Sequence, residues 1–297
     1  MMRSKLLSFL LLFVLLFSAA CTTQGASTPV VNAPTEAQTQ PTVMESSHPT
    51  TLTVLAAASL TEPFKEIGQL FETEHANTKV EFSFAGSQQL AQQLGQGASA
   101  DVFASASPKY MDAAVEAGRV TKDSAKTFAH NRLVVIYPSD NPAGIKALTD
   151  LAKPGIKLDF AAKEVPVGQY TLDFLDKAVK DSSFGASYKD DVLKNVVSYE
   201  DNVKAVLTKI SLGEADAGVV YTSDVTGEAA NKVIKLDIPD ALNVIATYPI
   251  ATISDSKNAG LAAAFMDMVL GTEGQNLLAK YGLDRKSTRL NSSHVSE

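Results

Sequence analysis

Apolar and polar positions follow two alternating periods from about residue 51 to residue 284. Short apolar runs such as Leu133–Tyr137 indicate buried strands, and Val80–Phe84 alternates as a half-buried strand does. Between such runs the apolar residues recur at helical spacing, as they do over residues 64–71. Strands that alternate with helices along the whole body predict an α/β fold with mostly parallel sheets.

Two serines stand where a predicted strand gives way to a predicted helix. Ser59 follows the apolar run of residues 52–58, and Ser87 follows Gly86 after the strand that ends near residue 84. A helix start presents unpaired N–H groups and a positive dipole end, so each serine either caps its helix or binds an anion. Because ligands bind at the carboxyl ends of parallel strands, two such serines favour one shared ligand site.

Three further residues could offer neutral hydrogen-bond donors. Val167 lies in a tight loop over residues 165–170, before a helix predicted for about 170–180, and can offer only its backbone N–H. Val203 lies at the start of a helix predicted for about 201–212, and Tyr221 ends a predicted strand. The alternatives are core packing for the valines and a surface position for the tyrosine.

The first twenty residues are typical of a signal peptide. Arg3 and Lys5 precede an apolar stretch, and small residues at 18–20 form a cleavage site before Cys21. A lone cysteine at this point resembles the lipid-modified cysteine of a bacterial lipoprotein; an incidental cysteine after an ordinary signal peptide is the alternative. Residues 22–50 have few large apolar side chains, which predicts a disordered tether after the lipidated Cys21.

Composition and charge exclude several classes of protein. The chain carries a formal net charge of −7 and has no basic run, which argues against nucleic acid as a partner. The single cysteine allows no internal disulfide.

Residues 285–297 lose all periodicity, and we interpret them as a non-native tail, with a natural polar tail as the alternative.

The motifs of common enzyme classes are missing from the sequence. No phosphate-binding glycine loop, nucleophile elbow or zinc-binding helix motif is present, and His75 and His130 belong to no metal-spaced cluster. A secreted hydrolase that uses Ser59 or Ser87 as nucleophile with His130 stays open as an alternative. The pattern favours a binding protein without enzymatic activity, catalytic residues or a cofactor.

Several ordered motifs resemble one family over essentially all of residues 51–284. The motifs are AAASL (56–60), FAGSQQL (84–90), DVFASAS (101–107), VPVGQY (165–170), NVKAVL (202–207), ADAGVVYTSD (215–224), YPIA (248–251) and GQNLLAKYG (274–282). On these motifs the chain is similar to the substrate-binding proteins of bacterial molybdate ABC transporters, which have the type II periplasmic-binding-protein fold. The resemblance implies that Ser59, Ser87, Val167, Val203 and Tyr221 line the ligand and hold the metal of molybdate through its oxygens.

The same resemblance implies a domain organisation. Lobe one would comprise residues 51–131 plus 249–284 and lobe two residues 132–248, joined by two crossing strands with hinges near 131–134 and 246–249. The expected partners are a small oxyanion, a membrane ABC permease and the membrane itself through a lipid on Cys21, with the protein a monomer outside the cytoplasm. The stretch 181–198 departs from the shorter loop expected for the family.

The predicted donors suit an anion that carries no proton. Molybdate and tungstate are fully deprotonated dianions at neutral pH, whereas phosphate is partly protonated and rewards a site that contains an acceptor. Sulfate is also a bare dianion and is smaller, so only the size of the cavity could reject it. Tungstate and sulfate therefore stay open as alternative ligands of the same fold.

Overall fold

The computed structural model describes residues 49–285. The expected signal peptide, Cys21, the tether up to residue 48 and the tail from residue 286 lie outside the described residues. No helix within residues 49–285 is long and apolar enough to cross a membrane.

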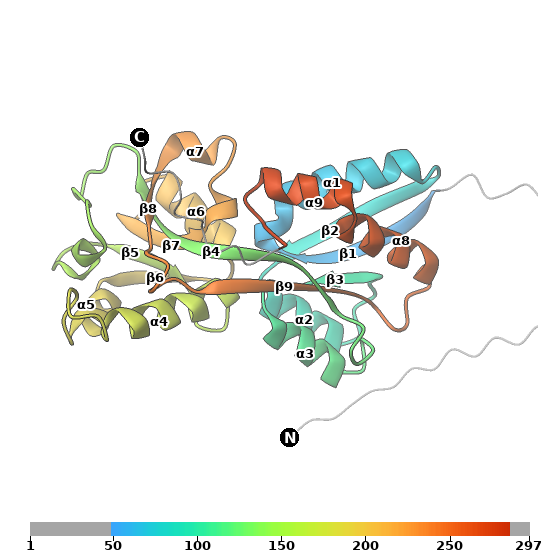
Figure 1. Ribbon diagram of the computed structural model, residues 1–297, viewed down its shortest axis with the longest axis horizontal. Coiled ribbons are helices and arrows are strands. Elements are labelled where there is room, and N and C mark those ends of the chain that lie inside the picture. The colour runs from blue at the N-terminus through green and yellow to red at the C-terminus, as the bar shows by residue number, and fades with distance from the viewer. Residues whose placement is uncertain (1–48, 286–297) are drawn as a thin grey trace, which may run out of the picture. The chain divides into compact units, whose positions relative to one another are not determined.

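The described chain alternates strands with helices, as the sequence pattern predicts (Figure 1). The strands are β1 (Thr50–Ala57), β2 (Thr78–Ala85), β3 (Val102–Ala104), β4 (Lys126–Pro138), β5 (Leu158–Ala161), β6 (Val196–Glu200), β7 (Ala217–Tyr221), β8 (Val233–Asp237) and β9 (Ile245–Thr252). The α-helices are α1 (Thr61–Glu74), α2 (Ser87–Gly95), α3 (Pro108–Glu116), α4 (Pro166–Ala178), α5 (Tyr188–Lys194), α6 (Val203–Ser211), α7 (Ala229–Lys232), α8 (Ala259–Leu270) and α9 (Thr272–Lys280). Short 3-10 turns are η1 (Ala58–Leu60), η2 (Leu148–Ala152) and η3 (Thr222–Asp224).

The strands pair in the order β2-β1-β3-β9-β4-β7-β5-β6, and β8 pairs with β4. Parallel pairs join β1 to β2 and β3, and β5 to β6 and β7. The pairs β3–β9, β4–β7, β4–β8 and β4–β9 are antiparallel. The α/β class is confirmed, but the sheets are mixed rather than mostly parallel, because β4 and β9 run against their neighbours.

Two long strands connect the two groups of parallel strands. Residues 126–132 of β4 pair with β9, which itself pairs with β3. From Leu133 onward β4 leaves β9 and pairs with β7 and β8 (Figure 1). The antiparallel strands β4 and β9 thus form the connection between the β1–β3 group and the β5–β7 group.

The core explains why these segments form helices and strands. Phe64, Ile67 and Phe71 of α1 are fully buried, and the Phe71 ring packs edge-on against Phe265 of α8 with ring centres 5.4 Å apart. On the other face of β1, Leu55 packs in a separate cluster with buried residues of α2, β3 and α3. Apolar burial of this kind is the dominant favourable term in folding.

Several predicted boundaries need correction. The strand predicted over Leu133–Tyr137 is the second half of the longer β4, which starts at Lys126. The tight loop predicted over residues 165–170 is the first turn of α4, which begins at Pro166. Proline is favoured at the first helical position because its missing N–H would have no partner there. His130, which the sequence places in no metal-spaced cluster, lies within β4.

Candidate functional site

One small cavity gathers the starts of several helices. The turn η1, the N-termini of α2, α4 and α6, and the end of β7 surround a cavity of about 10 Å³, which is room for about one water-sized sphere. All five residues predicted from the sequence line it. The lining residues are Ala57, Ala58, Ser59, Ala85, Gly86, Ser87, Ala106, Val165, Pro166, Val167, Asn202, Val203 and Tyr221.

Ser59 is held at the cavity by a chain of side-chain hydrogen bonds. Its hydroxyl lies 2.9 Å from that of Tyr248, to which the amide nitrogen of Asn131 donates over 3.3 Å. Either hydroxyl can donate to the other, because each has one proton and two acceptor sites. When Tyr248 donates to Ser59, the Ser59 proton is available to a group in the cavity. Ser59 lies in η1, immediately before α1, which agrees with its predicted strand–helix position.

Ser87 is oriented in a comparable way. It is the first residue of α2, and its hydroxyl oxygen accepts a hydrogen bond of 2.9 Å from the backbone N–H of Ala106. With an acceptor site filled by the chain, its proton is available to a ligand. Both serines are almost completely buried. Neither hydroxyl therefore depends on bulk water to hold its orientation.

Val167 and Val203 can contribute only backbone N–H groups. Both side chains are buried in the main hydrophobic core, and both residues also line the cavity. Core packing, given above as the alternative to a cavity position, is therefore compatible with it. Val167 is the second residue of α4 and Val203 the first residue of α6. N–H groups at these positions have no partner within their own helix. The Asn202 side chain caps Ala205 instead, over 3.1 Å.

Tyr221 is buried rather than exposed, which rejects the surface alternative. It is 1% exposed, and its hydroxyl has no hydrogen-bond partner within the described residues. Burial, with smaller contributions from neighbouring groups such as Tyr248, raises its pKa well above the usual value, so the phenol stays protonated. A buried donor without a partner is costly and therefore calls for a ligand that accepts a hydrogen bond.

The cavity lining carries no ionisable acid or base apart from this phenol. An anion would therefore be held by neutral hydroxyl and N–H donors together with the positive ends of helix dipoles. A carboxylate does lie close behind the lining, because Asp224 accepts a 3.0 Å hydrogen bond from the backbone N–H of Tyr221. Within residues 49–285 no group of three His, Cys, Asp or Glu side chains could hold a metal ion.

Two supporting residues were not predicted from the sequence. Tyr248 of β9 and Asn131 of β4 are both buried, and Asn131 also donates 2.7 Å to the Ser223 hydroxyl and accepts from Thr222. The motif at 248–251 contains Tyr248, but no local pattern marks it as a partner of Ser59. The two residues are separated by 189 positions in the chain, so only the fold reveals their contact.

The serines lack the geometry of a hydrolase. In the described part of the chain neither Ser59 nor Ser87 hydrogen-bonds to a histidine, since their partners are Tyr248 and Ala106. His130 instead pairs through its backbone with Asp284, and its ring lies 3.4 Å from the Thr247 hydroxyl. No base is therefore positioned to activate either serine.

The fold and this donor-lined cavity define the class of α/β periplasmic binding proteins. The sulfate-binding protein SubI from Mycobacterium tuberculosis superposes with a TM-score of 0.69 at 19% identity, over 79% of this chain and 86% of SubI, and at that identity it shows the fold alone. The chain belongs to the bacterial extracellular solute-binding protein family, whose model matches residues 52–284. Members of this family bind solutes and are not enzymes, which excludes the hydrolase alternative.

Two relatives extend this similarity over most of the chain. The molybdate-binding protein ModA from Mycobacterium tuberculosis is 36% identical over 231 residues, which cover 78% of this chain and 83% of ModA. The Bacillus subtilis protein YvgL, described as an ABC transporter substrate-binding lipoprotein, is 27% identical over 238 residues, which cover 80% of this chain and 88% of YvgL.

Proposed function

We propose that this solute-binding protein captures molybdate outside the cytoplasm and delivers it to the permease of an ABC transporter. The observation that carries the proposal is the buried phenol of Tyr221, which has no hydrogen-bond partner among the described residues and lies in a cavity lined by no other ionisable group. The similarity to ModA supports molybdate as the ligand and transport as the context. Ser59, Ser87, Val167, Val203 and Tyr221 would hold the anion through its oxygens.

The donor set accounts for the proposed selectivity. The helix-start N–H groups can only donate, and the hydroxyls of Ser59, Ser87 and Tyr221 each have a proton to offer the ligand. Because the lining holds no carboxylate, a protonated phosphate oxygen would lack the charged acceptor that suits its O–H. Tungstate, with the same charge and a comparable size, is the alternative ligand, and sulfate is a smaller one.

A ligand screen tests the proposal. The unfolding temperature of the purified chain is measured with molybdate, tungstate, sulfate, phosphate and no anion, and calorimetry follows on each anion that stabilises it. We expect a large rise with molybdate and none with phosphate. If only sulfate raised the unfolding temperature, sulfate rather than molybdate would be the ligand. If no anion raised it, the proposal would be rejected.

Serine variants connect that screen to the cavity. Ser59→Ala and Ser87→Ala should each weaken molybdate binding by about 1.5–3 kcal/mol, the range for a hydrogen bond to a charged group. Ser256→Ala is the matched control, because Ser256 bonds to Asp101 over 2.6 Å and does not line the cavity. Full affinity in both cavity variants would place the anion elsewhere.

We also propose that the protein is a monomer anchored by a lipid on Cys21. The position of this cysteine after the apolar leader and the lipoprotein description of YvgL support the anchor. Cys21→Ser, expressed in a bacterial host, should move the protein from the membrane fraction to the soluble extracytoplasmic fraction. A variant that stays with the membrane after signal cleavage would disprove lipidation at this residue.

A further inference from the structure

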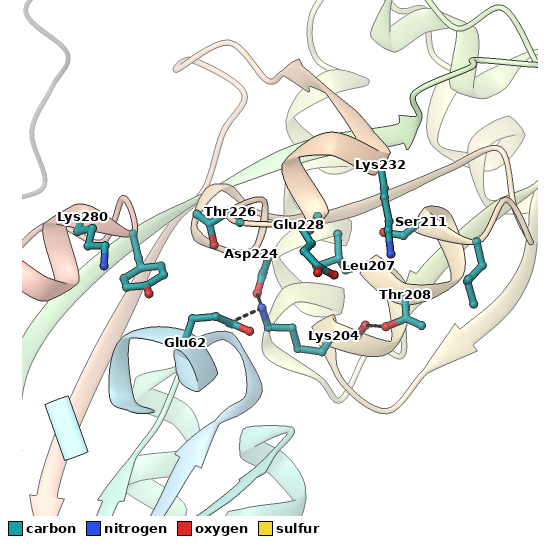
Figure 2. A pocket seen from close by; sticks show the side chains of 14 residues that line it. Glu62, Lys204, Leu207, Thr208, Ser211, Asp224, Thr226, Glu228, Lys232 and Lys280 are labelled. Carbon is teal, nitrogen blue, oxygen red and sulfur yellow. Dashed lines mark hydrogen bonds and ion pairs between the residues drawn. The ribbon is translucent and has the colours of Figure 1, made fainter. Parts of the chain in front are cut away.

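Lys204 forms two ion pairs although it is not one of the proposed ligand contacts. It follows Val203 in the first turn of α6, and its ammonium group lies between two carboxylates (Figure 2). One is Glu62 of α1, with a nitrogen–oxygen distance of 2.7 Å, and the other is Asp224 of η3, at 3.4 Å. Burial lowers the pKa of Lys204, but the two carboxylates outweigh it and keep the pKa above the usual value.

Asp224 makes this ammonium group relevant to the cavity. The Asp224 side chain is fully buried, and its Oδ2 accepts a hydrogen bond from the backbone N–H of Tyr221. Its Oδ1 has no hydrogen bond within the described residues, so the nearby positive charge of Lys204 compensates it. An uncompensated carboxylate here would repel a dianion held by the Tyr221 hydroxyl.

Glu62 gives the same lysine a second role. Glu62 lies in α1, within the segment predicted as lobe one, whereas Lys204 and Asp224 lie in the segment predicted as lobe two. The pair Lys204–Glu62 therefore joins the two segments (Figure 2). Gln88 and Asp201 join the same segments nearby through a 2.8 Å hydrogen bond. Separation of the lobes would break the ion pair and leave Lys204 with Asp224 alone.

We propose that Lys204 is a positioning residue that couples closure of the two lobes to anion capture. It does not touch the anion. It neutralises Asp224 behind Tyr221, and by pairing with Glu62 it slows the reopening that releases the ligand. This inference rests on the proposed function, because it concerns the lifetime of the anion complex.

Binding kinetics of the purified chain with molybdate test the coupling. The chain has no tryptophan and eight tyrosines, so stopped-flow tyrosine fluorescence can follow binding. Glu62→Gln should raise the dissociation rate about two- to fivefold and leave the association rate unchanged, as expected for a half-exposed ion pair. Lys204→Met should raise the dissociation constant about tenfold or more, because Asp224 is then buried without a counter-charge.

A double-mutant cycle separates this role from a structural one. The variant with both substitutions should bind no more weakly than Lys204→Met alone, because Glu62 acts through Lys204. Lys209→Met is the matched control on the same helix, since Lys209 pairs with Glu200 in the same predicted lobe. It should leave both rate constants unchanged.

Three outcomes would overturn the inference. Additive effects in the cycle, an unchanged dissociation rate in Glu62→Gln, or an equal effect of Lys209→Met would each do so while the wild-type chain still binds molybdate. Glu62→Gln keeps the test decisive if Lys204→Met fails to fold. A wild-type chain that binds no oxyanion would overturn the proposed function and this inference together.

Discussion

At the scale of single residues, the Tyr221 hydroxyl opposes stability in the absence of ligand and favours binding. The hydroxyl is buried without a hydrogen-bond partner among residues 49–285, which costs free energy in the unliganded protein. Tyr221→Phe should therefore leave the unfolding free energy unchanged or higher, while molybdate affinity falls by about 1.5–3 kcal/mol. Calorimetric titration and urea unfolding of the same preparation measure both quantities.

Tyr248 provides the matched comparison for this prediction. It is equally buried, but its hydroxyl contacts Ser59 and accepts from Asn131. Tyr248→Phe should therefore destabilise the unliganded protein by about 1–3 kcal/mol, because it leaves buried polar groups unpaired. If both variants lost the same stability, the Tyr221 hydroxyl would have a structural partner and its proposed role as a ligand donor would be wrong.

A second buried group gives stability a predictable pH dependence. Asp159 of β5 is fully buried, and burial, followed by the charge of Glu200, raises its pKa from 3.8 to about 7. Between pH 3.8 and about pH 7, Asp159 is therefore protonated in the folded protein and ionised in the unfolded chain. This contribution to stability is fully present below pH 3.8 and is lost as pH rises towards 7, by about 1.4 kcal/mol for each pH unit.

Asp159→Asn should remove that pH dependence. The unfolding free energy of the variant relative to the wild type should increase from pH 4 to about pH 7 and then become constant, which urea unfolding at several pH values can measure. Asp150 should show the opposite sign, because hydrogen bonding to Lys153 lowers its pKa to about 2. A constant difference between Asp159→Asn and wild type at all pH values would disprove the raised pKa.

At the scale of elements, the close approach of α2 to the segment before α6 depends on a glycine. A Cβ on Gly86 would lie 2.5 Å from the backbone oxygen of Asp201, too close for any real contact. Gly86 has φ −61°, which alanine also adopts, so the obstacle is steric. Gly86→Ala should therefore hold the two segments apart and weaken molybdate binding at least tenfold, with unliganded stability changed by only about 1 kcal/mol.

Gly95→Ala is the control for this prediction, at the other end of the same helix. There the nearest atom to an added Cβ is 3.9 Å away, an ordinary contact. Its affinity for molybdate should equal that of the wild type in the same titration. If Gly86→Ala also bound normally, α2 and the start of α6 would not need to meet around the ligand.

The helices beside the cavity were predictable because each has one apolar face, and β7 was predictable because it is a continuous buried run. Two strands, β6 and β8, were not predicted from the sequence. In β6, Val197 and Tyr199 point outward and are 61% and 56% exposed, so apolar side chains there do not mark a buried face. In β8 only Val233 is buried, which leaves too weak a pattern for a strand prediction. Strands with few buried side chains depend on their neighbours rather than on their own sequence.

The candidate site shows the same limit. Ser59 and Ser87 could be predicted because a serine at a strand–helix boundary is a local signal. The start of α4 was misread as a loop because Pro166 and Gly168 are typical of turns. Gly168 in fact lets α4 pack against the end of β5, since a Cβ there would lie 2.1 Å from the oxygen of Ala162. Such a contact between residues of separate elements has no local sequence signal.

At the scale of the whole described chain, the proposed hydrogen-bond donors belong to two groups of strands. Within the sheets, only β4 and β9 connect these two groups. Ser59 and Ser87 belong to the β1–β3 group, and Val203 and Tyr221 belong to the β5–β7 group. One anion bound by all of them should hold the two groups together. Without it, hinge motion near residues 131–134 and 246–249 should let them separate.

Small-angle scattering can measure this closure. Saturating molybdate should reduce the radius of gyration of the wild-type chain, because the anion bridges both groups of strands. Tyr221→Phe should show a smaller reduction, since one of the bridging donors is lost while the ring remains. Both proteins must be compared at saturation, so that weaker affinity is not mistaken for weaker closure. If the wild-type curve were the same with and without bound molybdate, the anion would enter a closed protein, and the coupling of capture to domain motion would be wrong.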